Sequence, residues 1–567
     1  MKKIHSYTLL FLVLLTTQLQ LHAQGAGWAK PFMDGASPLK VTTDKDGNVY
    51  SVGTFTYSDF DPGPGTYTMT SAYGAYDLFI SKLDSSGQFV WAKQIGGPSY
   101  TTPSDIKTDD QGNIYLAYTF EDTLDTDPGP STYYISSESF YSTCILKLTS
   151  SGNFIWAKEL TGNGYCYPVS IAVDTLHNVY TSGGVSGQNV DLDPGSGTYA
   201  VSTPSYYVQP NYTYIDYKWN TYISKLDPNG NFIFALTHSV SPGSISVNQA
   251  QEIVMFVSAD PSGYNSHDNQ VVAYDKNGSI KWLKDIPGQN EMGTIDKVNN
   301  VYVTGIFYGS TFDFDPGPGT YTIDPSPDGF SVSTFVLKLD SSGNFKWAQK
   351  VDKLYGPNQI ISDASDNIYM TGQYGGGLNI YFDVNSPNQD NILNSARGRG
   401  YIWSIGSNGS FRWVKQVGQG PDPYGGLRPN SLAMDGFGNI YTVGSFDGTL
   451  DFDCGPVINT LTATTSTDGY IHKLHGALYI TGIEEQTEAI KMSLFPNPTN
   501  SLVYFTYNRH LEHANLRIVD VNGKVMQESK GISTATYTID ISALPNGVYI
   551  VELLETKAIT HGKLIKD

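Results

Sequence analysis

The sequence is poor in cysteine, in charged residues and in long apolar runs. Its 567 residues include three cysteines, and 16% of the residues are charged. Three thiols form at most one disulfide, so no disulfide framework holds this fold. Lys and Arg number 34 against 54 Asp and Glu, which gives a net charge of −20 and too few cations to neutralise phosphates. These deficits exclude a disulfide-rich scaffold and disfavour a nucleic-acid-binding protein.

The apolar run nearest the N-terminus, residues 9–15, is too short for the roughly 20 residues that a membrane-spanning helix needs. Lys2 and Lys3 precede it, and Ala23 ends a small-residue cleavage site. This order is typical of a secretory signal peptide rather than a membrane anchor. We therefore expect residues 1–23 to direct export, and we find no later transmembrane segment in the sequence.

Internal repetition is the strongest signal in the chain. A motif of the form Asp-x-x-Gly-Asn-Val/Ile-Tyr recurs at intervals of 65, 65, 122, 67 and 72 residues, and 122 is two periods of 61. Its asparagines are Asn48, Asn113, Asn178, Asn300, Asn367 and Asn439. Six visible copies and one eroded copy, in the unit around 269–283, predict a seven-unit repeat architecture.

The first unit illustrates the parts. We expect strands at 48–55, 66–70, 78–83 and 88–93, with turns at 59–65 and 84–87 rich in Gly, Pro, Asp and Ser. No stretch has a sustained helical period. Four short strands per unit in seven units predict an all-β fold, a seven-bladed β-propeller over residues 24–483.

The two ends of the repeat region complement each other. Residues 28–30 (Trp-Ala-Lys) form a last strand without its preceding strand, whereas residues 471–474 end the seventh unit without a Trp-Ala-Lys. We expect Trp28 to Lys30 to join the last blade and close the ring, which removes exposed sheet edges.

A large aromatic residue recurs at one strand position, as Trp28, Trp91, Trp156, Phe234, Trp282, Trp347 and Trp413. A row of tryptophans is compatible with carbohydrate binding. A repeated position favours packing between neighbouring blades, because each such side chain buries a large area.

The motifs Phe-Ile-Ser-Lys-Leu-Asp-x-x-Gly-x-Phe-x-Trp-Ala-Lys and Asp-x-x-Gly-Asn-Val-Tyr resemble the SBBP-type repeat of exported bacterial seven-bladed propellers, over about residues 28–475. The Lys-Leu-Asp-x-x-Gly-x-x-x-Trp part is also similar to the tryptophan-docking repeat of quinoprotein dehydrogenases. That second likeness covers the packing motif alone and brings no quinone site.

Paired aspartates in five Asp-x-Asp-Pro/Cys-Gly loops are the best chemical candidates. Two carboxylates at i and i+2 beside a glycine suit a hard cation such as calcium, if other oxygens complete the coordination. The alternative is an Asx-type turn in which each carboxylate accepts backbone N–H groups. The candidate ligands are Asp59, Asp61, Asp125, Asp127, Asp191, Asp193, Asp313, Asp315, Asp451 and Asp453.

No catalytic motif emerges from the sequence. The histidines of the repeat region form no zinc-type pair on a helix, and neither a Gly-x-Ser-x-Gly elbow nor a phosphate-binding loop occurs. Five copies of an aspartate pair indicate a scaffold, whereas glycoside hydrolysis needs one unique pair in one cleft. No residue is therefore proposed as catalytic.

The C-terminal region differs from the repeats. Residues 484–491 belong to a polar linker, and residues 492–567 alternate apolar strands with Asn-Gly turns, which predicts a small Ig-like antiparallel β-sandwich. Phe495-Pro-Asn-Pro498, Asp520-Val-Asn-Gly-Lys524, Leu544-Pro-Asn-Gly-Val-Tyr549 and Lys563-Leu-Ile-Lys566 resemble, in this order, the type A C-terminal sorting domain of type IX secretion cargo. The resemblance implies recognition by the outer-membrane translocon, removal of the tail, and release or surface attachment of the propeller.

These features favour an exported or surface-displayed propeller that acts as a binding or adhesion scaffold for an extracellular glycan or protein. The alternative is a secreted hydrolase or lyase that acts on polysaccharide or peptide, with residues from several blades at the pore. A structural surface-layer role is a third possibility.

Overall fold

The computed structural model describes most of the chain in two compact units, residues 1–478 and 479–567. The expected signal peptide at 1–23 and the linker at 484–491 lie outside the described residues. The described residues are 27–137, 141–206, 216–258, 268–326, 332–375, 379–383, 392–394, 398–420, 425–454, 458–476, 492–495, 497–507, 514–520, 524–534, 536–554 and 559–566.

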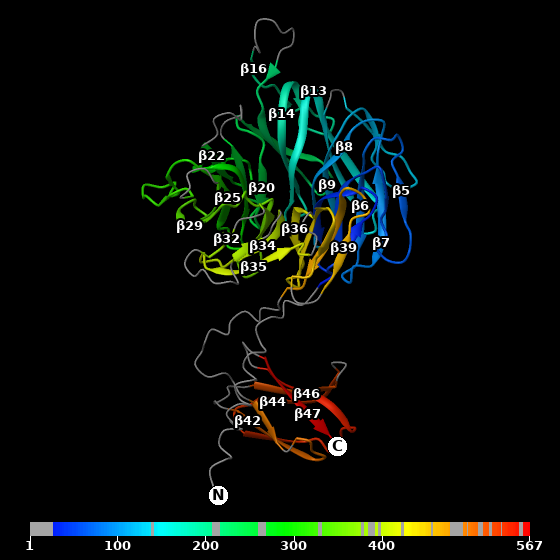
Figure 1. Ribbon diagram of the computed structural model, residues 1–567, viewed down its shortest axis with the longest axis vertical. Helices are drawn as coiled ribbons and strands as arrows, with labels where there is room; N and C mark the ends of the chain where they lie inside the picture. The colour runs from blue at the N-terminus through cyan, green and yellow to red at the C-terminus, as the bar shows by residue number, and fades with distance from the viewer. Residues whose placement is uncertain are drawn as a thin grey trace. The chain divides into compact units, whose positions relative to one another are not determined.

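Every regular element in the described residues is a strand, and unit 1 is built from antiparallel sheets of one pattern (Figure 1). Among its described residues, five sheets have four strands each, and a larger sheet contains two such sets that share the strand β13 (Phe154–Val173). The all-β fold is therefore as predicted, and repeated four-stranded sheets are what a β-propeller requires. In the described part of the chain, no helix could span a membrane.

The four strands of each set are numbered first to fourth in their order across the sheet. The first strands are β2 (Ser37–Thr43), β8 (Thr101–Thr108), the second half of β13, β20 (Ser244–Val247), β24 (Gln289–Ile295), β30 (Gln359–Ser362) and β36 (Leu427–Met434). The second strands are β3 (Val49–Phe55), β9 (Ile114–Phe120), β14 (Val179–Asp191), β21 (Ile253–Ser258), β25 (Val301–Phe307), β31 (Ile368–Tyr374) and β37 (Ile440–Phe446).

The third strands are β6 (Asp77–Leu83), β12 (Ser142–Leu148), β18 (Asn220–Leu226), β22 (Asp268–Tyr274), β28 (Ser333–Leu339), β34 (Arg399–Ile405) and β40 (Asp468–Leu474). The fourth strands are β7 (Phe89–Ile95), the first half of β13, β19 (Phe232–His238), β23 (Ile280–Pro287), β29 (Phe345–Asp352), β35 (Phe411–Val417) and β1 (Ala29–Phe32). Two-stranded hairpins follow several second strands: β4 (Tyr57–Asp59) with β5 (Thr68–Thr70), β10 (Thr123–Asp125) with β11 (Tyr134–Ser136), β26 (Phe312–Asp313) with β27 (Thr322–Ile323), β32 (Asn379–Tyr381) with β33 (Ile392–Asn394), and β38 (Thr449–Asp451) with β39 (Thr460–Thr462). In the set that β13 opens, β15 (Ala200–Val201) pairs with β14, and β16 (Ser205–Tyr206) pairs with β17 (Asp216–Tyr217).

The strand composition of the repeat differs from the prediction in one respect. The expected strand at 66–70 pairs only with β4 in a small hairpin, and the sheet's remaining strand is β2. The sequence analysis missed β2 because Pro38 and a bulge between Pro38 and Lys40 interrupt its alternation of polar and apolar residues. Pro103, Pro168 and Pro429 accompany the same bulge in three other first strands.

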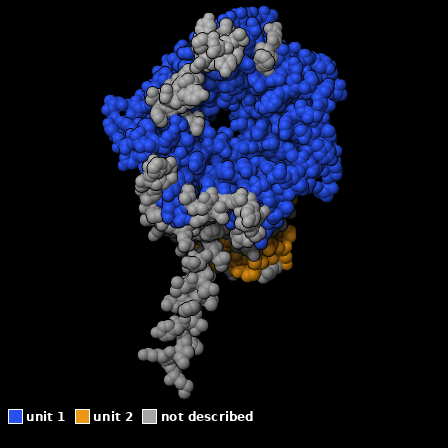
Figure 2. Space-filling view, turned by 45° about the horizontal axis from the view of Figure 1, so that its top comes forward, with its two compact units in different colours: residues 1–478 blue, residues 479–567 orange. Residues whose placement is uncertain are grey.

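The first strands contact one another in a closed cycle that runs β2, β8, β13, β20, β24, β30, β36 and back to β2. The strand β1 pairs with β40, with Ala29 opposite His472, so the N-terminal strand completes the last set. Figure 2 shows a hollow in the middle of one face of unit 1. The cycle of first strands is thus the innermost layer of this unit.

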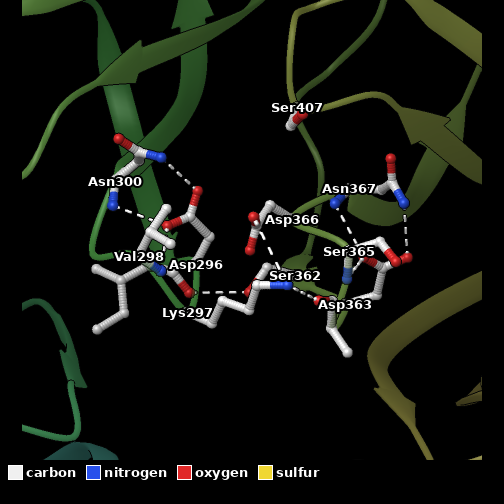
Figure 3. Close-up of polar contacts among 12 residues, drawn as sticks. Asp296, Lys297, Val298, Asn300, Ser362, Asp363, Ser365, Asp366, Asn367 and Ser407 are labelled. Carbon is white, nitrogen blue, oxygen red and sulfur yellow. Dashed lines mark hydrogen bonds and ion pairs between the residues drawn. The ribbon is translucent and has the colours of Figure 1, made fainter. Parts of the chain in front are cut away.

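The turns between first and second strands carry a repeated buried network. In the turn after β24, Asp296 accepts hydrogen bonds from the backbone N–H of Asn300 at 2.8 Å and from its side-chain amide at 2.7 Å. Asp363 and Asn367 repeat this geometry in the next set, and Lys297 reaches across to the second turn, 4.0 Å from Asp366 (Figure 3). The recurring Asp and Asn therefore hold the turn rather than a ligand.

The eroded unit keeps a four-stranded sheet, β20 to β23. Its turn has Asn248 in place of the aspartate, and the Asn248 amide donates to Glu252 at 2.9 Å while its oxygen accepts the Glu252 N–H at 2.9 Å. The amide and the carboxylate have thus exchanged positions in this turn. The Asp-x-x-Gly-Asn motif is therefore absent from the sequence of this unit.

The recurring tryptophans dock on the following set. Trp347 Nε1 donates to the Ser407 carbonyl at 3.2 Å, and Lys338 Nζ donates to the same oxygen at 2.8 Å. Gly409, with φ +86°, lies under the Trp347 ring, where a Cβ would stand 3.0 Å from Cδ2. Trp28, Trp156 and Trp282 make the same indole bond to the next turn, so these side chains pack between sets, as predicted.

Unit 2 contains two antiparallel sheets. One has the order β41 (Met492–Phe495), β42 (Leu502–Tyr507) and β45 (Thr536–Asp540), and the other has the order β44 (Val525–Ile532), β43 (Ala514–Asp520), β46 (Gly547–Leu554) and β47 (Ile559–Lys566). Val503 and Phe505 of the first sheet and Ile518, Val551 and Leu564 of the second belong to one buried cluster. The unit is therefore a small β domain with its own core.

Candidate functional site

The paired aspartates lie in the hairpins that follow the second strands. Asp59 Oδ1 accepts hydrogen bonds from the N–H groups of Asp61 at 3.0 Å and Tyr67 at 2.8 Å, and Asp61 Oδ1 accepts the Gly63 N–H at 2.8 Å. A Cβ on Gly65 would stand 2.1 Å from Asp61 Oδ2, so glycine is required there. This is the Asx-type turn that the sequence left open as the alternative to calcium.

The other loops repeat that geometry. Asp125, Asp191, Asp313 and Asp451 each accept two backbone N–H groups, at i+2 and i+8, and Asp127, Asp193 and Asp315 each accept a glycine N–H. Within the described residues, no group of three or more His, Cys, Asp or Glu could hold a metal ion. Calcium binding by these loops stays a prediction.

The three cysteines and His472 have pKa values that burial shifts. Burial raises the pKa of the Cys166 and Cys454 thiols to about 12 and that of Cys144 further still, and all three are free cysteines. Burial lowers the pKa of His472 to about 4, so this histidine is neutral in the folded protein at neutral pH. Such groups are poor nucleophiles or proton carriers near pH 7.

Two kinds stand out among the exposed tyrosines of unit 1. One kind recurs: Tyr67, Tyr133, Tyr199 and Tyr321 each lie 4.9 to 5.8 Å, ring centre to ring centre, from a phenylalanine of the fourth strand. These rings fasten each hairpin to its sheet. Because they repeat, they belong to the scaffold.

The second kind is a run of four rings, defined here as the aromatic run: Tyr141, Tyr165, Trp219 and Tyr167. Successive ring centres lie 5.8 Å apart from Tyr141 to Tyr165, 5.9 Å from Tyr165 to Trp219 and 5.1 Å from Trp219 to Tyr167. Tyr141 and Tyr165 are each 36% exposed, and Trp219 and Tyr167 are half-buried. The rings form a surface that solutes can reach.

A departure from the repeat makes room for this run. Tyr167 pairs with Gly184, where a Cβ would stand 2.7 Å from both Tyr167 Cζ and Pro242 Cγ. The equivalent residue is Thr54, Ile306 or Ser445 in other sets. Glycine therefore lets the Tyr167 ring lie over the second strand, toward Trp219.

The sequence analysis missed the aromatic run because its members come from three separate segments. The available signal was local composition, since residues 205–219 contain five tyrosines and one tryptophan. Only the long pairing of β13 with β14, from Thr161 to Val173, brings Tyr165 and Tyr167 beside Trp219.

Comparison with known families identifies the C-terminal unit. The family model of the secretion system C-terminal sorting domain matches residues 493–567. The chain carries a type IX sorting domain. This sorting domain directs the protein to the cell surface or the extracellular space through the type IX secretion system.

The model of the β-propeller repeat family, SBBP, matches residues 90–117 and 412–449, which lie in the part of the chain before the sorting domain. A sperm-tail PG-rich repeat model also matches residues 315–353, which begin at one of the Pro-Gly loops. The chain is thus a type IX cargo protein with β-propeller repeats.

Similar individual proteins are distant. An uncharacterized WD repeat-containing protein of Acanthamoeba polyphaga mimivirus is 21% identical over 90% of this chain, which spans 42% of that protein's length. A fungal alcohol oxidase of the AA5 family, solved with copper, is 11% identical with a TM-score of 0.35 over 95% of this chain and 99% of its own. A Bacteroides caccae protein of unknown function is 9% identical with a TM-score of 0.29 over 60% and 89% of the two chains. Likenesses at this level carry no functional inference.

Proposed function

We propose that the exported protein is a saccharide-binding scaffold whose aromatic run contacts the ligand. In this proposal unit 1 is a seven-bladed ring that β1 closes, and unit 2 is an Ig-like sandwich. The support for the ring is the cycle of contacts among first strands and the pairing of β1 with β40.

The aromatic run is the observation that carries the proposed binding function. The repeated tryptophans, aspartates, asparagines and hairpin tyrosines all have scaffold partners, so residues that break the repeat are the ones left for a ligand. Sugar rings present C–H groups that pack on aromatic faces, and ligand sites combine such faces with a few polar groups. Tyr and Trp also expose an O–H or N–H at the ring edge.

A saccharide fits this surface better than a folded protein does. The run is a single file of four rings, and a stable protein interface needs about 800 Å² per partner around a well-packed apolar centre. An extended sugar chain can follow successive rings that lie 5 to 6 Å apart.

The test uses the purified full chain on an array of neutral and acidic oligosaccharides together with extracellular proteins. The variant Trp219→Ala removes the ring that joins Tyr165 to Tyr167, and Tyr355→Ala removes a 68% exposed tyrosine elsewhere in unit 1. We expect Trp219→Ala to weaken saccharide binding about tenfold or more and Tyr355→Ala to leave it unchanged. Saccharide binding that survives Trp219→Ala, or binding to proteins alone, would contradict the proposal.

A further inference from the structure

The first strands contain one charged cluster that breaks the repeat. The residue four positions before the turn is uncharged in five sets: Ser170, Ser244, Met292, Gln359 and Ser431. In the first two sets it is Lys40 on β2 and Asp105 on β8, and Lys107 follows Asp105 on the same strand. We call Lys40, Asp105 and Lys107 the channel cluster.

Asp105 bonds to the neighbouring first strand, as the residue at the same position does in another set. Its Oδ2 accepts the Ile171 N–H of the next first strand at 3.1 Å, as Ser431 Oγ accepts the Val41 N–H at 3.3 Å in another set. Its Oδ1 accepts its neighbour's N–H, that of Ile106, at 2.9 Å, and Lys107 Nζ lies 2.8 Å from Oδ1 and 2.9 Å from Oδ2. The carboxylate is therefore fully engaged.

The Lys40 ammonium has N–H donors that are available for further hydrogen bonds. Among the described residues, its ammonium has no hydrogen-bond acceptor, and its charged neighbours are Asp105, which favours the cation, and Lys107, which opposes it. Burial lowers the pKa of Lys40. Two ammonium groups, that of Lys107 in an ion pair and that of Lys40 by longer-range attraction, thus face one carboxylate, which leaves a local excess of positive charge in a chain of net charge −20.

Within the cluster, Lys107 is the residue that solvent reaches most easily. The Lys107 side chain is 40% exposed on β8, a strand of the innermost layer, and the Asp105 side chain beside it is 13% exposed. Tyr167 lies three residues before Ser170, whose Oγ is 3.4 Å from Asp105 Oδ2. At about 3.3 Å per strand residue, the aromatic run begins roughly 10 Å from the cluster.

We propose that the channel cluster binds the carboxylate of an acidic sugar whose neighbouring sugars stack on the aromatic run. Lys40 and Lys107 donate charge-assisted hydrogen bonds to that carboxylate. The surrounding negative charge repels a polyanion, so the fitting ligand has isolated acidic units in a neutral chain. This inference rests on the proposed function and names the ligand class.

The experiment measures binding of the full chain to two probes by calorimetry: a xylo-oligosaccharide with one glucuronic acid branch and the same oligosaccharide without it. The variants are Lys40→Met and Lys107→Met, with Lys276→Met as a control of equal charge change on an exposed turn. We expect the wild type to prefer the acidic probe about tenfold or more, because each hydrogen bond to a charged group contributes about that factor. Each channel variant should reduce this preference, and Lys276→Met should keep it.

Equal affinity of the wild type for the two probes, or an unchanged preference in both channel variants, overturns the inference. If a variant fails to fold, the salt dependence of binding to the wild type still tests the inference. Added NaCl must weaken binding of the acidic probe and leave binding of the neutral probe unchanged. Trp219→Ala separates the two proposals: loss of both probes in this variant, with channel variants that behave as wild type, supports the binding function and refutes the channel site. Binding of neither probe to the wild type refutes the acidic-sugar inference.

Discussion

Replacing Phe32 by alanine tests whether the N-terminal strand closes unit 1. Phe32 is 3% exposed, and its ring lies 5.4 Å from Phe79 and 6.1 Å from Phe60, which belong to the first set. Because β1 pairs with β40 of the last set, this side chain joins the two ends of the repeat region. Truncating a buried phenylalanine costs about 3 to 5 kcal/mol.

The expected shift in melting temperature follows from the size of the unit. Unfolding about 450 residues at roughly 2.1 cal/mol/K per residue gives an entropy near 0.9 kcal/mol/K, so the loss lowers Tm by about 3 to 5 °C. The control Met33→Ala changes the next residue, which is 42% exposed, and should shift Tm by less than about 1 °C. Calorimetry of the full chain measures both variants. Equal Tm values for Phe32→Ala and Met33→Ala would refute the argument that β1 closes the cooperative unit.

Two further predictions concern pH and calcium. His472 has a pKa of about 4 in the fold and about 6.5 when unfolded, so its contribution to stability is present above pH 6.5 and disappears as pH falls toward 4, by about 1.4 kcal/mol per pH unit and about 3 kcal/mol in total. Urea unfolding at pH 7 and pH 4 should therefore show a smaller loss for His472→Gln than for the wild type, and equal losses would contradict the assignment. Calcium binding by the paired aspartates predicts that excess chelator lowers Tm and that calcium at about 100 times Kd restores about 2.7 kcal/mol; an unchanged Tm counts against a calcium site.

The repeat architecture was predictable because each set carries its own turn and docking residues. Trp347 over Gly409 and Asp296 with Asn300 are contacts between residues whose spacing recurs in the sequence. The strand β2 was not predictable in this way, since a bulge at Pro38 hides its alternation.

The candidate binding residues could not be predicted from recurring sequence patterns. The paired aspartates were conspicuous because they recur, and recurrence reflects their role in hairpins such as that of Asp59. Lys40 and Trp219 were inconspicuous because each occurs once, and their neighbours Asp105 and Tyr167 come from other strands. Sites that break a repeat need the fold to assemble them.

The pairing of β1 with β40 orders events during synthesis. Ala29 emerges from the ribosome early, and its partner His472 emerges near the end of unit 1, immediately before the sorting domain. Closing so long a loop costs entropy, and the last sheet cannot be completed until both strands exist. A nascent chain that is interrupted anywhere before β40 therefore lacks both its final sheet and the type IX sorting domain. Such an incomplete repeat region never carries the export signal of the C-terminal unit.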